Sequence, residues 1–165
     1  MKFLIALTLF LPLLGHAANA EYLKVYLMQP KPVMLAKMNG IEDMDRYVKE
    51  IEVNINKKLA EMPSNPAWGF IVVGVREDGK IKAWVDTDDN ISKEVSTAMI
   101  NVTENTKSFA VKSGAVVFAL GFGINGAALP EEKSPFPTDW KKISGCTNED
   151  CMQIDTEAVV LKTFE

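Results

Sequence analysis

The chain has 165 residues, with 22 Asp or Glu, 18 Lys or Arg and a net charge of −4. Its one histidine is His16, in a leader that we expect to be removed, which excludes His-dependent hydrolases, Cys-His proteases and His-ligated zinc from the mature protein. The sequence contains no basic block, so we expect no nucleic-acid partner.

Residues 1–20 have the pattern of a secretory signal peptide. A positively charged start precedes the apolar run Phe3–Leu14, and Ala18-Asn19-Ala20 is a small-x-small cleavage signature. A retained membrane anchor is the alternative, but the run is shorter than the roughly 20 apolar residues that span a bilayer. We therefore expect cleavage before Glu21, a periplasmic or secreted protein, and no membrane span after cleavage.

Residues 21–165 suit one compact domain. Without Lys2, 17 basic side chains face 22 acidic ones, a net charge of −5. The stretch Glu21–Met28 alternates, which predicts a strand. We expect one side of this strand to face a core, through Leu23, Val25 and Leu27. The opposite side carries Tyr22, Lys24 and Tyr26. Two prolines in "QPKPV" end this strand.

A helix and a hairpin follow. Apolar residues recur at steps of three and four through Ile41–Leu59, which predicts an amphipathic helix. Gly69–Asp86 contains two apolar stretches joined through Asp78-Gly79, a strong signal for a β-hairpin. A second apolar periodicity, from Ile91 to Phe109, predicts a second helix.

The segment "DTDDN" between hairpin and helix has two interpretations. Asp86, Asp88 and Asn90 are spaced like the start of an EF-hand calcium loop, but Ile91 and Thr97 stand where that loop has Gly and Glu. Asp and Asn also commonly begin helices. We favour the helix start over a weak cation site, and we expect no metal and no cofactor.

The stretch Gly114–Gly126 predicts a strand with unequal sides. One side is bulky and apolar and suits a core, whereas the other carries Ala115, Val117, Ala119, Gly121 and Gly123. Glycine in a strand often marks the close approach of other backbone. Two interpretations remain: the small side is crossed by the C-terminal segment or the proline-containing loop, or it accepts a partner.

The C-terminal part is predicted to hold a loop, a disulfide and a strand. "ALPEEKSPFPTDWKK" contains three prolines and reads as a loop, and Thr156–Phe164 reads as a last strand. Cys146 and Cys151 are the only cysteines, and a close pair in an exported protein predicts a local disulfide. A redox-active pair is the alternative, but four residues separate the two cysteines and neighbouring acids raise a thiol pKa.

The predicted order of elements defines the fold class. Strand, helix, hairpin, helix, strand, loop and strand predict an α+β protein, a two-layer sandwich of a mainly antiparallel sheet with two amphipathic helices on one face.

The segment from Met62 to Ile124 resembles the C-terminal domain of the TonB/TolA type. The resemblance rests on the Pro-containing turn and DG hairpin of "MPSNPAWGFIVVGVREDGKIKAWVD" and on the helix, link and strand of "ISKEVSTAMINVTENTKSFAVKSGAVVFALGFGI". It covers somewhat under half of residues 21–165. It implies a module that binds partner segments by adding a strand to a sheet edge. The chain lacks the long Pro-rich spacer of that family.

These observations predict a non-enzymatic protein-binding or adaptor module. We expect it to capture a protein segment by β-strand addition at Gly114–Gly126, through Val117, Ala119, Gly121 and Gly123, with Trp84 and Trp68 as aromatic anchors. For both tryptophans ordinary packing is the alternative. An inhibitor or immunity protein against a toxin or hydrolase is the second hypothesis. An enzyme is the third, although the sequence offers no nucleophile–base pair.

Overall fold

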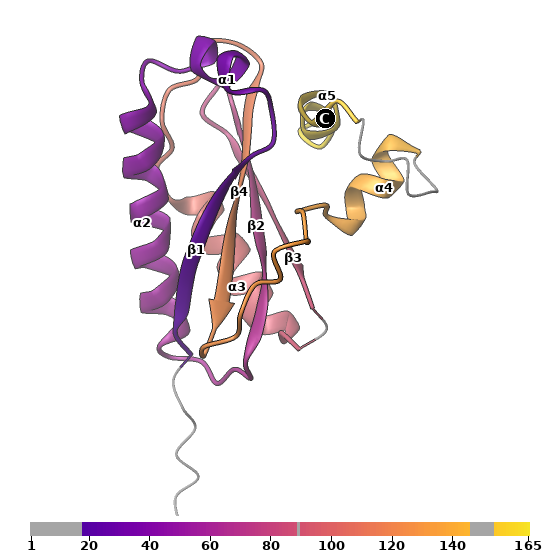
Figure 1. Cartoon of the computed structure of the whole chain (residues 1–165). Coiled ribbons are helices and arrows are strands. Elements are labelled where there is room, and N and C mark those ends of the chain that lie inside the picture. The colour runs from indigo at the N-terminus through magenta and orange to yellow at the C-terminus, as the bar shows by residue number, and fades with distance from the viewer. Residues whose placement is uncertain (1–17, 89, 146–153) are drawn as a thin grey trace, which may run out of the picture.

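The computed structural model describes residues 18–88, 90–145 and 154–165 (Figure 1). Within these residues four strands and five helices follow one another along the chain. Their order is β1 (Ala20–Leu27), α1 (Lys31–Lys37), α2 (Ile41–Leu59), β2 (Ala67–Arg76), β3 (Ile81–Thr87), α3 (Lys93–Asn105), β4 (Ala115–Ile124), α4 (Thr138–Ser144) and α5 (Thr156–Lys162). Cys146 and Cys151 lie outside the described residues, so their pairing stays a prediction.

The strands form one antiparallel sheet in the order β1-β4-β2-β3. The expected α+β class is confirmed, as is the β2–β3 hairpin, in which Gly79 takes φ +80°. β4 pairs with β1 on one side and with β2 on the other. β1 and β3 are therefore the edges of the sheet.

One face of the sheet packs on α2 and α3, as the sequence predicts. The bulky side of β4 is buried there, and we call this side the α2/α3 face. Tyr47 of α2 lies edge-on to Phe118, with ring centroids 6.4 Å apart. The residues that β4 contributes are Val116, Phe118, Leu120, Phe122 and Ile124.

The opposite face is also covered, so the expectation of helices on one face only is incomplete. Here α4 and α5 pack on β2 and β4, on the side away from α2 (Figure 1). Trp140 of α4 and Val160 of α5 are fully buried on this side. We call it the C-terminal face. The small residues Ala115, Val117 and Ala119 of β4 make room for this second layer.

Two predictions for the C-terminal part are wrong. The expected last strand, Thr156–Phe164, is helix α5, because the Asp155 carboxylate accepts a hydrogen bond from Ala158 N (3.1 Å) and so caps a helix. A short apolar run does not by itself distinguish strand from helix. The proline-rich loop also continues into α4, which ends at Gly145 with φ +68°.

The first strand forms, but its sides are not as predicted. A β-bulge between Tyr22 and Lys24 changes the alternation. Tyr22 consequently packs on the α2/α3 core, and Tyr26 lies edge-on to Phe70 across the C-terminal face, with ring centroids 5.3 Å apart. The expected core residues Leu23, Val25 and Leu27 are instead partly exposed. The prolines after the strand begin α1, where proline is well tolerated in the first turn.

Candidate functional site

Four of the six residues expected to contact a partner lie in the middle of the sheet. Val117, Ala119, Gly121 and Gly123 belong to β4 and are buried. Since β4 has a hydrogen-bonded neighbour on each side, it offers no free edge. Strand addition at Gly114–Gly126 is therefore excluded, and the place beside β4 is filled by the chain's own β1.

The small side of β4 is crossed by the segment that follows it. A Cβ at Gly121 would lie 2.6 Å from Leu129 Cδ2 and 3.2 Å from Tyr26 Cε2. A Cβ at Gly123 would overlap the carbonyl oxygen of Ala127. Of the two interpretations of the small side, the crossing segment is confirmed.

Trp84, one of the two expected aromatic anchors, lies on β3 under α4. Its ring centroid is 5.5 Å from that of Trp140, in an edge-to-face arrangement. Trp68, the other expected anchor, is edge-on to Phe70 at 6.4 Å. Both tryptophans thus contribute to the layer on the C-terminal face, as the packing alternative predicts.

The β3 edge carries features that protect a strand from pairing. The backbone N of Ala83 donates to the Glu104 carboxylate (3.0 Å), so a side chain of α3 occupies an outward-facing donor. Asp86 accepts from Phe136 N (2.7 Å), which ties the loop before α4 to this strand. Helix side chains that cover edge groups, and charges along an edge, both disfavour strand addition.

The β1 edge carries a bulge and the charge of Lys24, but beyond Ala20 no helix side chain of the described chain hydrogen-bonds to its outward main-chain groups. Met28 N donates to Val117 O (3.2 Å), and main-chain groups alternate along a strand, so those of Val25 and Leu27 point away from β4. Near the start of the strand Ala20 N donates to Asn56 of α2 (2.9 Å). Beyond that point no described residue hydrogen-bonds to the outward groups of Val25 or Leu27. The second half of β1 is therefore an open edge.

This open edge is also apolar. Leu23, Val25 and Leu27 are 49%, 40% and 42% exposed. The described chain has seven exposed large hydrophobic residues. Five of them gather here: these three on β1, and Val33 and Leu35 on α1 directly after it. Apolar side chains gathered at a strand with free main-chain groups are typical of a protein-binding surface. We call Leu23–Leu27 the β1 edge segment.

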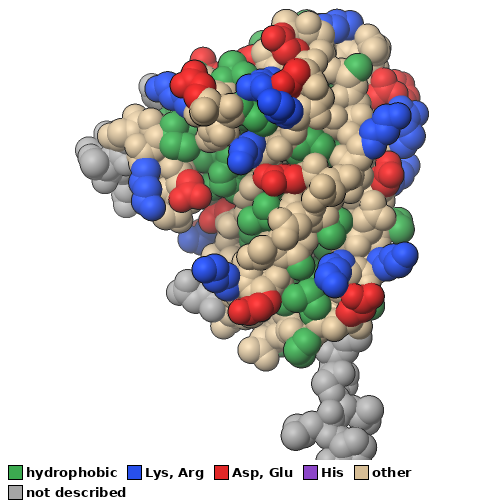
Figure 2. Space-filling model, turned by 180° about the vertical axis from the view of Figure 1, so that it is seen from behind, with side chains coloured by type: hydrophobic (Ala, Val, Ile, Leu, Met, Phe, Trp, Pro, Cys, Tyr) green, Lys and Arg blue, Asp and Glu red, His purple; other side chains and the backbone are tan. Residues whose placement is uncertain are grey.

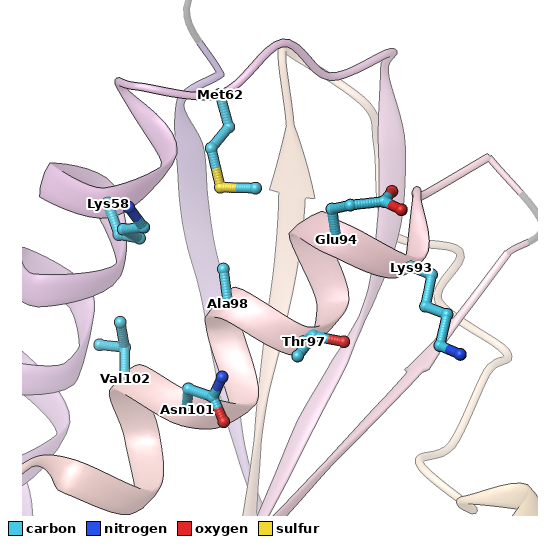
Figure 3. Close-up of a pocket in the computed structure, with 8 residues that line it drawn as sticks. All are labelled: Lys58, Met62, Lys93, Glu94, Thr97, Ala98, Asn101 and Val102. Atoms are coloured by element: carbon cyan, nitrogen blue, oxygen red, sulfur yellow. The ribbon is translucent and has the colours of Figure 1, made fainter.

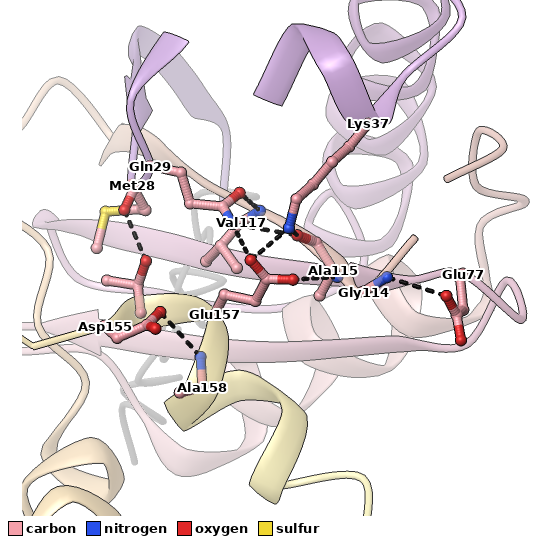
Figure 4. A network of polar contacts seen from close by, with 11 residues as sticks. Met28, Gln29, Lys37, Glu77, Gly114, Ala115, Val117, Asp155, Glu157 and Ala158 are labelled. Carbon is pink, nitrogen blue, oxygen red and sulfur yellow. Dashed lines mark hydrogen bonds and ion pairs between the residues drawn. The ribbon is translucent and has the colours of Figure 1, made fainter. Parts of the chain in front are cut away.

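A buried polar network fixes the far end of the β1 edge segment (Figure 4). The Gln29 side chain accepts from Val117 N (2.9 Å) and donates to Ala115 O (3.1 Å). Its amide thereby takes the place of one more backbone residue of β1. Lys37 of α1 forms an ion pair with Glu157 of α5, and Glu157 also accepts from Ala115 N (3.0 Å). The network holds α1 and α5 to the first residues of β4.

Burial also affects one tyrosine of β1. The hydroxyl of Tyr22 is buried and forms no hydrogen bond with a described residue. Burial, and the negative charge of Glu52 on α2, raise the pKa of Tyr22 well above its usual value. Tyr22 therefore stays neutral and serves as an apolar support under the β1 edge segment.

The rest of the described surface offers a groove and a mixture of charges. A groove of about 600 Å³ lies between the end of α2 and the start of α3, where Met62 and Ala98 point into it and Lys58 and Glu94 stand at its rim (Figure 3). Seen from behind, the molecule carries acidic and basic side chains interspersed with small apolar areas (Figure 2). This mixture favours no single class of ligand.

Among the described residues of the acidic segment before α3, Asp86 is directed away from Asp88 and Asn90. Asp86 turns to Phe136 N, whereas Asp88 accepts from the side chain of Asn90 (3.1 Å). The helix begins at Ser92, whose hydroxyl accepts from Val95 N (3.2 Å). The segment does start a helix, with Ser92 rather than Asp or Asn as the cap. Within the described residues no group of three His, Cys, Asp or Glu side chains is placed to hold a metal.

Comparisons with protein families, with characterised proteins and with solved structures give no match for this chain. None of the helices in the described part of the chain has the length and apolar character needed to cross a lipid bilayer. The two sheet edges are therefore the features of the molecule that bear most directly on its function.

Proposed function

We propose that this protein is an exported, non-enzymatic protein-binding module that takes up an extended segment of a partner protein beside β1. The observation that carries the proposal is the contrast between the edges. On β3 a carboxylate covers an outward donor, whereas on β1 the outward groups of Val25 and Leu27 are free and flanked by exposed apolar side chains. In strand addition, main-chain hydrogen bonds give affinity and alternate side chains give specificity.

The chemistry of the β1 edge segment defines the occupant. Val25 and Leu27 lie opposite Leu120 and Phe118, on the α2/α3 face, so apolar side chains of a bound segment would extend that core. On the other face the Lys24 ammonium lies 4.7 Å from the centre of the Tyr26 ring, so an acidic or polar side chain suits that side. The partner is thus an extended segment with alternating apolar and polar or acidic residues.

A second copy of the chain is a poorer occupant. The bulge between Tyr22 and Lys24 leaves only a short straight run, and in a two-fold pairing each strand would bring its own bulge. A flexible segment of another protein adapts to one bulge more readily than a second rigid strand does.

Site-specific photo-crosslinking tests the proposal. A photoreactive phenylalanine derivative is placed at Leu27, on the β1 edge, or at the matched control position Val85, on the β3 edge, and the exported protein is irradiated in cells. We expect Leu27 to give a crosslink to a different protein whose linked peptide alternates as described, and Val85 to give none. Adding Val25→Lys should remove that crosslink by placing a charge at the edge.

Three results would overturn the proposal. They are a crosslink from Val85 alone, no crosslink from either position, or a crosslink from Leu27 to a second copy of the chain. The last would assign the edge to self-association. The thermal melt of each variant separates lost binding from lost folding, because Leu27 and Val25 are partly exposed and their replacement should leave the fold intact.

A further inference from the structure

The three residues before Glu21 are integral parts of the fold. Ala18 and Ala20 are each 2% exposed and belong to the core of the α2/α3 face. Ala20 is the first residue of β1 and lies opposite Ile124 of β4. Residues of a cleavage signature are removed with the leader, so they normally have no part in the mature fold.

Four hydrogen bonds hold these residues in place. Ala18 N donates to Met62 O (3.2 Å), and Ala20 N donates to Asn56 Oδ1 (2.9 Å). Asn19 and Asn125 form a reciprocal pair: Asn19 N donates to Asn125 Oδ1 (3.1 Å), and Asn125 N donates to Asn19 O (2.9 Å). The described chain thus begins at the end of the sheet where α2 and β4 also end (Figure 1).

The reciprocal pair also ties the leader-proximal residues to the turn after β4, in which Asn125 and Gly126 both have positive φ and Ala127 N donates to Ile124 O (3.2 Å), as is common for Asn-Gly. Asn125 has φ +52°, the one positive φ of a non-glycine residue in the described chain. Its side chain also donates to Ser64 O (2.8 Å), so Asn125 joins β4, the turn after α2 and the residues before Glu21. Cleavage before Glu21 would remove the two hydrogen bonds between Asn19 and Asn125, and it would also remove the core contacts of Ala18 and Ala20.

The sequence offers a second cleavage signature three residues earlier. Gly15-His16-Ala17 is also small-x-small, and a cut after it leaves all of Ala18–Ala20 in the mature chain. We infer that the leader is removed between Ala17 and Ala18 and that the mature protein begins at Ala18, an inference that rests on the export proposed above. The new amino group keeps its place beside Met62 O, to which Ala18 N donates (3.2 Å).

N-terminal sequencing and intact-mass measurement of the exported protein test this inference. The full chain is produced with its own leader and purified from the periplasm or medium. We expect the chain to start at Ala18. A start at Glu21 overturns the inference but leaves export standing, whereas a chain that retains Met1 overturns the export itself.

Two leader variants sharpen the test. The residue before the cut must be small, whereas the middle residue of the signature tolerates bulk, so Ala17→Leu should abolish the Ala18 terminus and His16→Leu should preserve it. If Ala17→Leu redirects cleavage to Glu21, the shortened protein should unfold at a lower urea concentration than the His16→Leu product. Identical termini from the two variants would overturn the inference.

Discussion

Gly123 and Gly121 occupy two neighbouring positions on the small side of β4, and they should respond differently to one added methyl group. At Gly121 the group in the way is the end of the Leu129 side chain, 2.6 Å from an added Cβ, and it can move by rotation. At Gly123 the group in the way is the Ala127 carbonyl, part of the backbone of the crossing segment. A backbone carbonyl moves only if the turn after β4 moves with it.

The expected energies follow from two opposing effects. Replacing a strand glycine by alanine should by itself stabilise by about 0.5–1 kcal/mol, because the unfolded chain loses freedom. Overpacking costs about 1–3 kcal/mol, with a backbone contact at the upper end and a movable side chain at the lower. Gly123→Ala should therefore destabilise by about 2 kcal/mol and Gly121→Ala by close to nothing.

Urea denaturation of the two purified variants beside the wild type measures this difference. For a domain of this size a loss of about 2 kcal/mol lowers the urea midpoint by roughly 1 M. Gly121→Ala is the matched control, since it makes the same chemical change two residues away on the same side of the strand. If Gly123→Ala proves as stable as Gly121→Ala, the close crossing of β4 by Ala127 is refuted.

Three further changes test other parts of the structure. Phe118→Ala, at a fully buried position, should lower the free energy of unfolding in urea by about 3–5 kcal/mol. A variant as stable as the wild type would show that the α2/α3 core is misassigned. Burial raises the pKa of Asp86, so its contribution to stability is greatest at low pH and is lost as pH rises through the folded-state pKa. Asp86→Asn, which keeps an acceptor for Phe136 N, should therefore be more stable than wild type at pH 7 but not at acid pH, and a pH-independent difference would contradict this. Thiol labelling of the denatured, unreduced protein should find no free thiol, because Cys146 and Cys151 are joined. Changing both cysteines to Ser should lower the free energy of unfolding by about 2 kcal/mol. Complete loss of folding would mean that the disulfide has a larger role.

The sequence predicts the first layer of this fold well and the second layer poorly. The stripe of α2, the Asp78-Gly79 turn and the bulky side of β4 each carry a local signal that matches their place in the structure. The helices of the C-terminal face are short, and Thr156–Lys162 contains an apolar run whose length fits either a strand or a helix. The signal that distinguishes them is Asp155, because a carboxylate directly before such a run favours a helix N-terminus.

The position of β4 illustrates a limit of local patterns. Its small residues indicate close approach of other groups, but they do not state whether those groups belong to the chain or to a partner. That distinction depends on strand order, and the neighbour of β4 on one side is β1, from the opposite end of the chain. The exposure of β1 depends on strand order in the same way: Val25 and Leu27 lie opposite Leu120 and Phe118 on the α2/α3 face, but they are partly exposed because β1 is an edge strand.

The two edges of the sheet carry unequal protection, and this inequality favours binding over aggregation control as the reason for an apolar β1. Each edge has one outward N–H covered by a helix side chain, at Ala20 by Asn56 and at Ala83 by Glu104. On β3 the covered N–H belongs to Ala83, in the middle of the strand. On β1 it belongs to Ala20, the first residue, so the outward main-chain groups of the β1 edge segment stay open. The Gln29 network then orders the far end of the same strand without covering its outer side. A strand that is held at both ends and open between them is preorganised, so a bound segment need not order it, and the entropic cost of association falls on the partner alone.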